Sequence, residues 1–140
     1  YYGDEAGVCG WTDPDNRRAY PWGHENQELI EFHRYLVGIR KRNRAFRKGS
    51  LKPLLAENGV IAYGRFNKEG ERGIVVVNST GQIKRVRIPV WQAEVPADGM
   101  MTQIIYTDAE GYSVEEKEYP VVEGKVKVFV GAHGAIVLKN

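Results

Sequence analysis

From Gly49 onward the chain alternates apolar and polar residues, and glycines interrupt this alternation at short intervals. Successive side chains of a β-strand point to opposite faces, so a two-residue alternation predicts strands that bury one face. The glycines fall mostly 10 to 13 residues apart, at positions 59, 70, 81, 99, 111, 124 and 134. This spacing is typical of strand, turn and strand in succession. We expect about seven or eight short strands in residues 49–140, as an antiparallel β-sandwich of the Greek-key type.

Three stretches support the strand prediction in particular. Residues 85–90 and 125–130 carry valine or isoleucine at alternate positions, with mostly arginine or lysine between them. Residues 73–77, Gly-Ile-Val-Val-Val, are continuously apolar, which favours a central strand. The pair Asn58-Gly59 favours a tight turn between two strands.

The segment from His24 to about Phe46 has helical periodicity instead. Its apolar residues recur three or four positions apart and form one broad face, at Leu29, Phe32, Leu36 and Ile39. Acidic residues lie in its first half and basic residues in its second half, as the helix dipole favours. The organisation therefore changes near residue 48, and 140 residues have room for one full core and a smaller part.

The stretch from Gly3 to Gly23 is about 20 residues long and predicts a loop. Structureless loops of this length are usually functional or disordered. Within Thr-Asp-Pro-Asp-Asn-Arg-Arg, the turn-forming residues place Asp13 and Arg17 on the same side of a bend. An Asp beside an Arg can bind two neighbouring hydroxyls of a sugar, but the two side chains can equally form a salt bridge that only fixes the loop. The aromatic residues nearby have two interpretations as well, as flat surfaces for a sugar ring or as ordinary packing, at Tyr1, Tyr2, Trp11, Tyr20 and Trp22.

Composition excludes several classes of function. The net charge of +2 argues against a dedicated nucleic-acid partner, and no segment has the apolar length of a membrane span. A basic cluster at residues 40–48 is explained by the end of the predicted helix. The three histidines are widely spaced and suggest no metal site. The single cysteine leaves the compartment undecided between cytoplasmic and extracellular.

Two further residues have an ordinary and a special interpretation. Cys9 has no evident base partner, so we interpret it as a free thiol rather than a nucleophile. Asn78-Ser79-Thr80 matches a glycosylation acceptor pattern, but it equally fits a polar hairpin loop. We expect the loop.

Beyond these patterns, Tyr-Tyr-Gly-Asp-Glu at residues 1–5 and Asp-Pro-Asp-Asn-Arg-Arg-Ala-Tyr-Pro-Trp-Gly at residues 13–23 resemble a known family. They are similar to the segment after the eighth barrel strand in the α-amylase superfamily, glycoside hydrolase family 13. Residues 25–54 resemble that family's last barrel helix and the entry into its C-terminal sandwich, and residues 131–138 resemble the closing strand. Residues 13–23 are most similar to the neopullulanase, cyclomaltodextrinase and amylopullulanase branch. Ala19 and Tyr20 depart from the Pro-Met of many members.

This resemblance implies that residues 1–48 are the end of a (β/α)₈ catalytic barrel and residues 49–140 a C-terminal β-sandwich domain. In the family, the catalytic carboxylates come from earlier strands, so a chain without them is a fragment that is not catalytically competent alone. Asp13 and Arg17 match positions that hold a glucose unit on the non-reducing side of the cleavage point. Tyr2 and Trp22 are fainter candidates for shaping that pocket. No cofactor is implied for this chain, and calcium is implied only for the barrel upstream.

We therefore expect the terminal part of an α-glucan hydrolase, which contributes contacts to the sugar and a stabilising sandwich. The implied partners are an α-glucan oligosaccharide and the N-terminal barrel. The apolar helix face would otherwise need a second copy of the chain to cover it. Two alternatives remain. One is a free-standing carbohydrate-binding β-sandwich module, and the other is a purely structural domain, favoured if Asp13 and Arg17 pair with each other and are buried.

Overall fold

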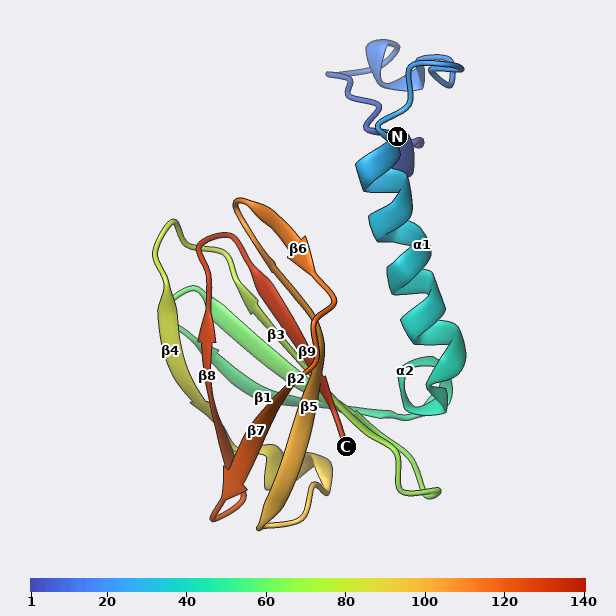
Figure 1. Ribbon diagram of the computed structural model, residues 1–140. Helices are drawn as coiled ribbons and strands as arrows, with labels where there is room; N and C mark the ends of the chain where they lie inside the picture. Colours follow the sequence, from blue (N-terminus) through green and yellow to red (C-terminus); the bar gives the residue numbers. More distant parts are fainter. The chain divides into compact units, whose positions relative to one another are not determined.

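A computed structural model describes residues 1–140 and divides them into two compact units, Tyr1–Arg42 and Asn43–Asn140. The first unit contains two short 3-10 helices, η1 (Asp4–Ala6) and η2 (Asp15–Arg17), and the helix α1 (Gln27–Arg42). Figure 1 shows the helices as coiled ribbons. The assignment of residues 1–48 to a barrel and of residues 49–140 to a separate domain stays a prediction.

The predicted helix is shorter than expected. α1 ends at Arg42, and residues Arg44–Lys48 form a separate short helix, α2. Between them Asn43 has an extended backbone, with φ of −112° and ψ of 113°. Asparagine competes poorly for the interior of a helix because its side chain hydrogen-bonds locally in other conformations. The apolar residues keep their helical spacing across Asn43, so the sequence pattern could not show this interruption.

The start of α1 is held by η1. The side-chain oxygen of Asn26 accepts a hydrogen bond from the Leu29 amide at 3.0 Å, which satisfies a free donor at the helix start. The Asn26 amide donates in turn to the Ala6 carbonyl at 3.1 Å, and Ala6 is buried. The last turn of α1 carries only basic charges, as the sequence predicted. The N-terminal loop and α1 therefore form one unit.

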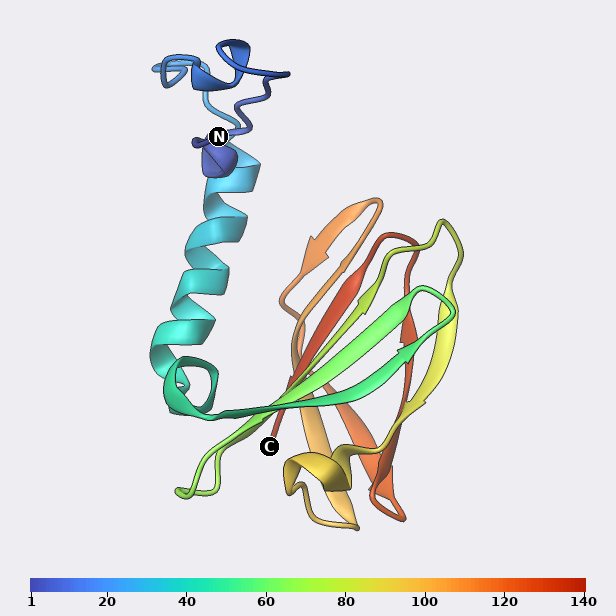
Figure 2. The same cartoon turned by 180° about the vertical axis from the view of Figure 1, so that it is seen from behind.

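The second unit is mainly β, as predicted, and has nine antiparallel strands rather than seven or eight. Their order in the sheet is β1-β2-β3-β9-β5-β7-β8-β4, with β6 paired to β5. The sheet is nearly closed and encloses the core, which the two opposite views of Figures 1 and 2 make plain. The strands are β1 (Ser50–Glu57), β2 (Val60–Phe66), β3 (Arg72–Asn78), β4 (Lys84–Ile88), β5 (Gly99–Asp108), β6 (Gly111–Ser113), β7 (Lys117–Val122), β8 (Lys125–Val130) and β9 (Ala135–Lys139), and the short 3-10 helix η3 (Val90–Ala93) follows β4.

The alternation in the sequence corresponds to burial in the structure. On β8, Val126, Val128 and Val130 are fully buried, while Lys125, Lys127 and Phe129 are exposed. β3 contains the predicted apolar run and lies between β2 and β9, so its central position is confirmed. Complete burial of one such aliphatic side chain contributes about 1.5–3 kcal/mol. The core combines residues of several strands, including Ile74, Val76, Ile88, Met101, Val126, Val128, Ile136 and Leu138.

One predicted turn is confirmed and one is wrong. Asn58 and Gly59 join β1 to β2 with φ angles of 49° and 77°, the left-handed conformation that a two-residue hairpin turn requires. Asn78-Ser79-Thr80 is no hairpin loop, because β3 pairs with β2 and β9 while β4 pairs with β8. Asn78 is also buried, and its amide donates to the carbonyls of Gln82, Val130 and Gly131. This side chain therefore supports a crossover between distant strands.

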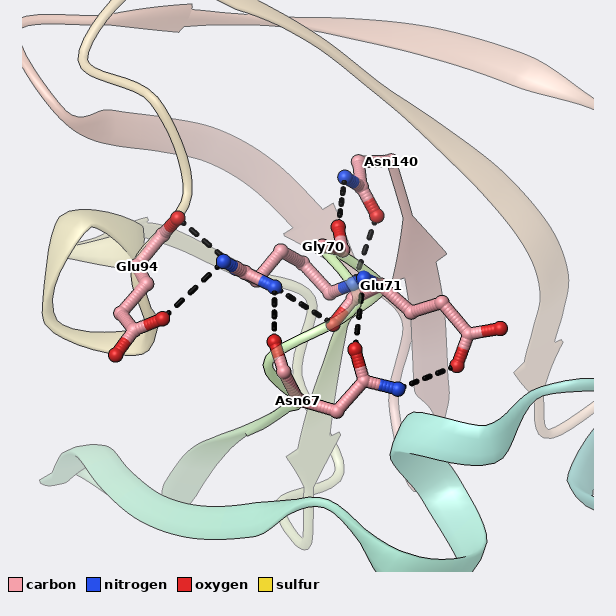
Figure 3. Close-up of polar contacts among 6 residues, drawn as sticks. Asn67, Gly70, Glu71, Glu94 and Asn140 are labelled. Carbon is pink, nitrogen blue, oxygen red and sulfur yellow. Dashed lines mark hydrogen bonds and ion pairs between the residues drawn. The ribbon is translucent and has the colours of Figure 1, made fainter.

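α2 is anchored on the β2–β3 hairpin. A Cβ on Gly73 would lie 2.3 Å from the ring of Phe46, so the ring rests directly on the strand backbone. One carboxylate oxygen of Glu71 accepts hydrogen bonds from the Ala45 amide at 2.9 Å and from the Asn67 side chain at 2.7 Å. Figure 3 shows Glu71 and Asn67 pointing toward each other at the hairpin.

The same hairpin is tied to other parts of the second unit by Arg72. Its guanidinium donates to the Asn67 carbonyl at 2.8 Å and to the backbone and carboxylate oxygens of Glu94 at 3.0 and 3.1 Å. The Arg72 amide donates to the side chain of Asn140, which itself donates to the Gly70 carbonyl (Figure 3). The Arg72 side chain is only 13% exposed, although the Glu94 side chain that it pairs with is 60% exposed.

Replacement of Glu71 tests the anchor of α2. Glu71→Ala removes the acceptor of the Ala45 amide and should lower the free energy of unfolding by about 1.5–3 kcal/mol, the contribution of a hydrogen bond to a charged group. Urea unfolding measures the loss. Glu69→Ala is the matched control, because Glu69 forms an exposed ion pair with Arg44 at 3.6 Å that should contribute about 0–1 kcal/mol. Equal losses in the two variants would contradict the anchoring role.

Candidate functional site

Asp13 and Arg17 lie together, as the sequence predicted. The Nε of Arg17 donates to Oδ1 of Asp13 at 2.7 Å. The bend between them is closed by a hydrogen bond from the Arg17 amide to the Pro14 carbonyl at 3.0 Å. The two side chains are 57% and 64% exposed, for Arg17 and Asp13 respectively. The condition for a purely structural pair is therefore only half met, because the residues are paired but not buried.

Several polar atoms of this pair remain available. The second carboxylate oxygen of Asp13 accepts no hydrogen bond from the protein, and the two terminal nitrogens of Arg17 donate none. A carboxylate oxygen can accept from one hydroxyl while a guanidinium N–H donates to its neighbour. The pair can thus hold two adjacent hydroxyl groups without breaking its own ion pair.

The aromatic rings of this loop form two groups, and only one of them contacts the pair. The guanidinium of Arg17 lies over the Tyr1 ring at 5.0 Å, and Tyr1 meets Tyr2 edge to face with ring centres 5.7 Å apart. Trp22 instead contacts Tyr20 with ring centres 4.6 Å apart, and no hydrogen bond or ring contact joins it to Asp13 or Arg17. The structure therefore links Tyr2 to the pair through Tyr1 and leaves Trp22 in a separate group.

Asp15, which the sequence suggested only as a turn-forming residue, has a larger role in this loop. Its Oδ2 accepts the Trp11 amide at 2.8 Å, and its Oδ1 accepts Nε and Nη2 of Arg18 at 2.9 and 2.7 Å. The loop also closes tightly elsewhere, because a Cβ on Gly10 would lie 2.7 Å from the backbone of Asn16. Asp15 therefore joins both sides of the bend that carries Asp13 and Arg17. The spacing of four residues back to Trp11 and three forward to Arg18 was the available signal.

The contacts of Asp15 also affect its ionisation. The hydrogen bond from the Trp11 amide, and then that from Arg18, hold the pKa of Asp15 below its ordinary value of 3.8. Because the pKa is lower in the folded state, these contacts stabilise the loop above pH 3.8 and are lost as pH falls through the folded pKa.

The chemical shift of the Trp11 amide nitrogen should report this titration. We expect it to stay constant at neutral and mildly acidic pH and to change with a midpoint below 3.8. In Asp15→Asn the transition should disappear, because the carboxyl is gone. Asp4→Asn, which replaces an exposed carboxylate on η1, should leave the transition unchanged and is the control. A midpoint at or above 3.8 in the unmodified chain would show that the contacts are not formed.

Other chemistry is sparse in residues 1–140. No group of three or more histidine, cysteine, aspartate or glutamate side chains is arranged to hold a metal ion. Cys9 is exposed, and its sulfur lies 3.6 Å from the Gly7 carbonyl. Asp4 and Glu5 are neighbours on η1. The helices of the structure are all too short or too polar to cross a membrane.

Residues 55–140 match the family described as "Alpha amylase, C-terminal all-beta domain". The chain belongs to the α-amylase family. The match covers most of the second unit, so this mainly β part is the C-terminal domain of α-amylase family glucan hydrolases.

Relatives of the α-amylase family cover the remainder of the chain as well. The amylopullulanase of Thermoanaerobacter thermohydrosulfuricus is 37% identical over 150 residues, which cover 100% of this chain and 10% of that protein. Neopullulanase 2 of Thermoactinomyces vulgaris is 32% identical over 143 residues, covering 100% of this chain and 22% of that protein. The cyclomaltodextrinase of Thermoanaerobacter pseudethanolicus is 39% identical over 84 residues, covering 59% of this chain and 14% of that protein. The predicted similarity to this branch is confirmed.

Solved α-amylase family structures have the same fold. The α-amylase of Geobacillus thermoleovorans in complex with acarbose has a TM-score of 0.80 at 21% identity, covering 99% of this chain and 28% of that chain. A cyclomaltodextrinase structure has a TM-score of 0.71 at 24% identity, covering 100% of this chain and 22% of that chain. The chain thus spans a small part of each relative, about a tenth of the amylopullulanase of Thermoanaerobacter thermohydrosulfuricus.

Proposed function

We propose that the chain is the terminal part of an α-glucan hydrolase and that its first unit contributes contacts to a sugar subsite. The observation that carries this proposal is the exposed Asp13–Arg17 pair, whose outer polar atoms have no protein partner. Support comes from the relatives, which are named amylopullulanase, neopullulanase and cyclomaltodextrinase. All three names denote enzymes that act on glucans or their cyclic forms.

The pair would bind a glucose unit through two of its hydroxyl groups. The free oxygen of Asp13 accepts a hydrogen bond from one hydroxyl, and a terminal N–H of Arg17 donates to the next. Tyr1 and Tyr2 would place flat apolar surface beside the ring, and Trp22 would do so from its own group with Tyr20. Such contacts hold the substrate in the geometry in which the bond is cut.

The chemical step would come from residues outside this chain. Hydrolysis of a glycosidic bond usually needs two carboxyl groups about 5–9.5 Å apart on opposite sides of the sugar. Asp4 and Glu5 are consecutive residues of one short helix, so they are a poor match for this arrangement. The rest of the parent protein would supply the acid, the nucleophile and any bound calcium. The all-β domain would then act as a stabilising element.

Substitutions at the pair test the subsite in the full-length parent enzyme. Asp13→Ala or Arg17→Ala should lower kcat/KM on a long maltooligosaccharide. The lowered ratio should correspond to a loss of about 1.5–3 kcal/mol of transition-state stabilisation, because each substitution removes a hydrogen bond to a charged group. Arg34→Ala on α1 is the control for charge, since Arg34 is exposed and pairs only with Glu31. An unchanged kcat/KM in both site variants would remove them from the subsite. Tight maltooligosaccharide binding by the 140-residue chain alone would favour a free-standing module instead.

The apolar face of α1 indicates which partner this chain binds, the upstream barrel or a second copy. Leu29, Phe32 and Leu36 are half-buried along this face, and Ile39 is buried. In the parent protein we propose that the upstream barrel packs against it. In a chain without that barrel, we propose that Leu29 and Leu36 contact a second copy, because a self-complementary patch can cover itself about a two-fold axis.

Sedimentation equilibrium distinguishes these situations. The isolated 140-residue chain should form a concentration-dependent dimer, and Leu36→Glu should convert it to a monomer because the charge opposes burial. Arg34→Glu changes a residue on the polar side of α1 and should leave the dimer intact. A monomer at high concentration, or a dimer unaffected by Leu36→Glu, would exclude self-association through this face.

A further inference from the structure

The outer surface of β4, β8 and β7 carries a concentration of positive charge that the proposed function does not use. Arg85 and Arg87 on β4 and Lys125 and Lys127 on β8 all point outward and are exposed. Arg87 lies directly opposite Lys127 in the register of the two strands, so like charges face each other across the ladder. We refer to the outward side chains of these three strands as the basic face.

None of these four cations has a carboxylate partner. They take part in none of the ion pairs of the chain, and Arg85 instead lies over the ring of Phe129 at 5.4 Å. Like charges opposite each other destabilise a strand pair. No ion pair offsets this repulsion, and Glu123 is the one carboxylate that lines the hollow between these strands.

Protection of a sheet edge explains only half of this arrangement. β4 is the last strand in the sheet order, and charged side chains on an edge strand prevent pairing with other molecules. That accounts for Arg85 and Arg87. It does not account for Lys125 and Lys127, because β8 has neighbours on both sides, β4 and β7. These lysines occupy ordinary solvent-facing positions of β8, but no ion pair of the chain includes them.

The basic face is also concave and partly apolar. A hollow of about 420 Å³ opens between the three strands. Its apolar wall is formed by Pro120 and Val122 of β7, and Val122 is 59% exposed. Phe129, 54% exposed, lies on the same side of β8 as the lysines. The hollow is lined by Arg87, Pro120, Val122, Val126, Lys125, Lys127 and a single carboxylate, Glu123.

We propose that the basic face binds an acidic segment of polypeptide in which carboxylates alternate with apolar side chains. The carboxylates would pair with the four cations, and the apolar side chains would contact Val122, Pro120 and Phe129. Of the residues of this face, the arginines and Phe129 are of the types enriched in interfaces between proteins. A nucleic acid or a sulfated glycan offers rings that can stack on Phe129, but it has no aliphatic side chains to fill the hollow beside Pro120 and Val122. Charge and apolar surface together thus favour a protein ligand.

Binding of a synthetic copolymer of glutamate and tyrosine to the 140-residue chain tests this proposal at moderate salt. The double variant Arg87→Glu/Lys127→Glu should lose at least about tenfold in affinity, because two attractions become repulsions. Lys48→Glu/Lys68→Glu, the matched control, makes the same change of net charge at exposed residues of the second unit outside the face, and should lose less than about twofold. Arg87→Gln/Lys127→Gln, which introduces no new repulsion, should lose affinity to a smaller extent.

Two further probes separate the alternatives. Val122→Ser/Phe129→Ser should weaken binding of the copolymer but not of polyglutamate, which has no apolar side chains. Heparin, as an anionic glycan, should bind more weakly than the copolymer. The proposal is overturned if the copolymer does not bind, or if the control variant loses as much affinity as Arg87→Glu/Lys127→Glu. It is also overturned if heparin binds more tightly than the copolymer and loses affinity with the same substitutions.

Discussion

Burial of aliphatic side chains from β3, β8 and β9 in one shared core is the interaction on which the second unit depends. Because successive residues of a strand point to opposite sides, the core positions also determine which residues face solvent. On β8 the buried valines force Lys125, Lys127 and Phe129 outward together. The same alternation on β4 exposes Arg85 and Arg87. The charged surface is therefore a geometric consequence of the core, although its unpaired charge is not.

Polar side chains complete the structure where the core cannot reach. Asn78 donates to carbonyls on both sides of a crossover and is almost fully buried. Glu71 and Arg72 connect a hairpin to α2 and to η3. In the first unit Asp15 connects Trp11 to Arg18 within an exposed loop. Its contacts are therefore sensitive to pH and solvent. A partly buried hydrogen bond, such as that from the Ala45 amide to Glu71, is stronger than an exposed one, such as that from the Trp11 amide to Asp15.

The sequence patterns were most reliable where structure is local. Alternation located the strands, and the apolar run at residues 73–77 correctly indicated an interior strand. The pattern failed at Asn43, where one extended residue divides a helix, and at Asn78, whose role depends on strands far along the chain. The pairing of Asp13 with Arg17 followed from their spacing in a bend. Their exposure did not, because it depends on how the whole loop folds, and the contribution of Asp15 was overlooked for the same reason.

The position of β9 has a consequence for synthesis of the protein. β9 lies between β3 and β5 and hydrogen-bonds to both, although residues 135–139 are about 60 positions beyond β3. Until the ribosome has released this segment, β3 and β5 each present an unpaired edge. Strands of that kind are prone to pair with other chains. In the interval between translation of β3 and emergence of β9, these two edges are therefore open to pairing with other chains.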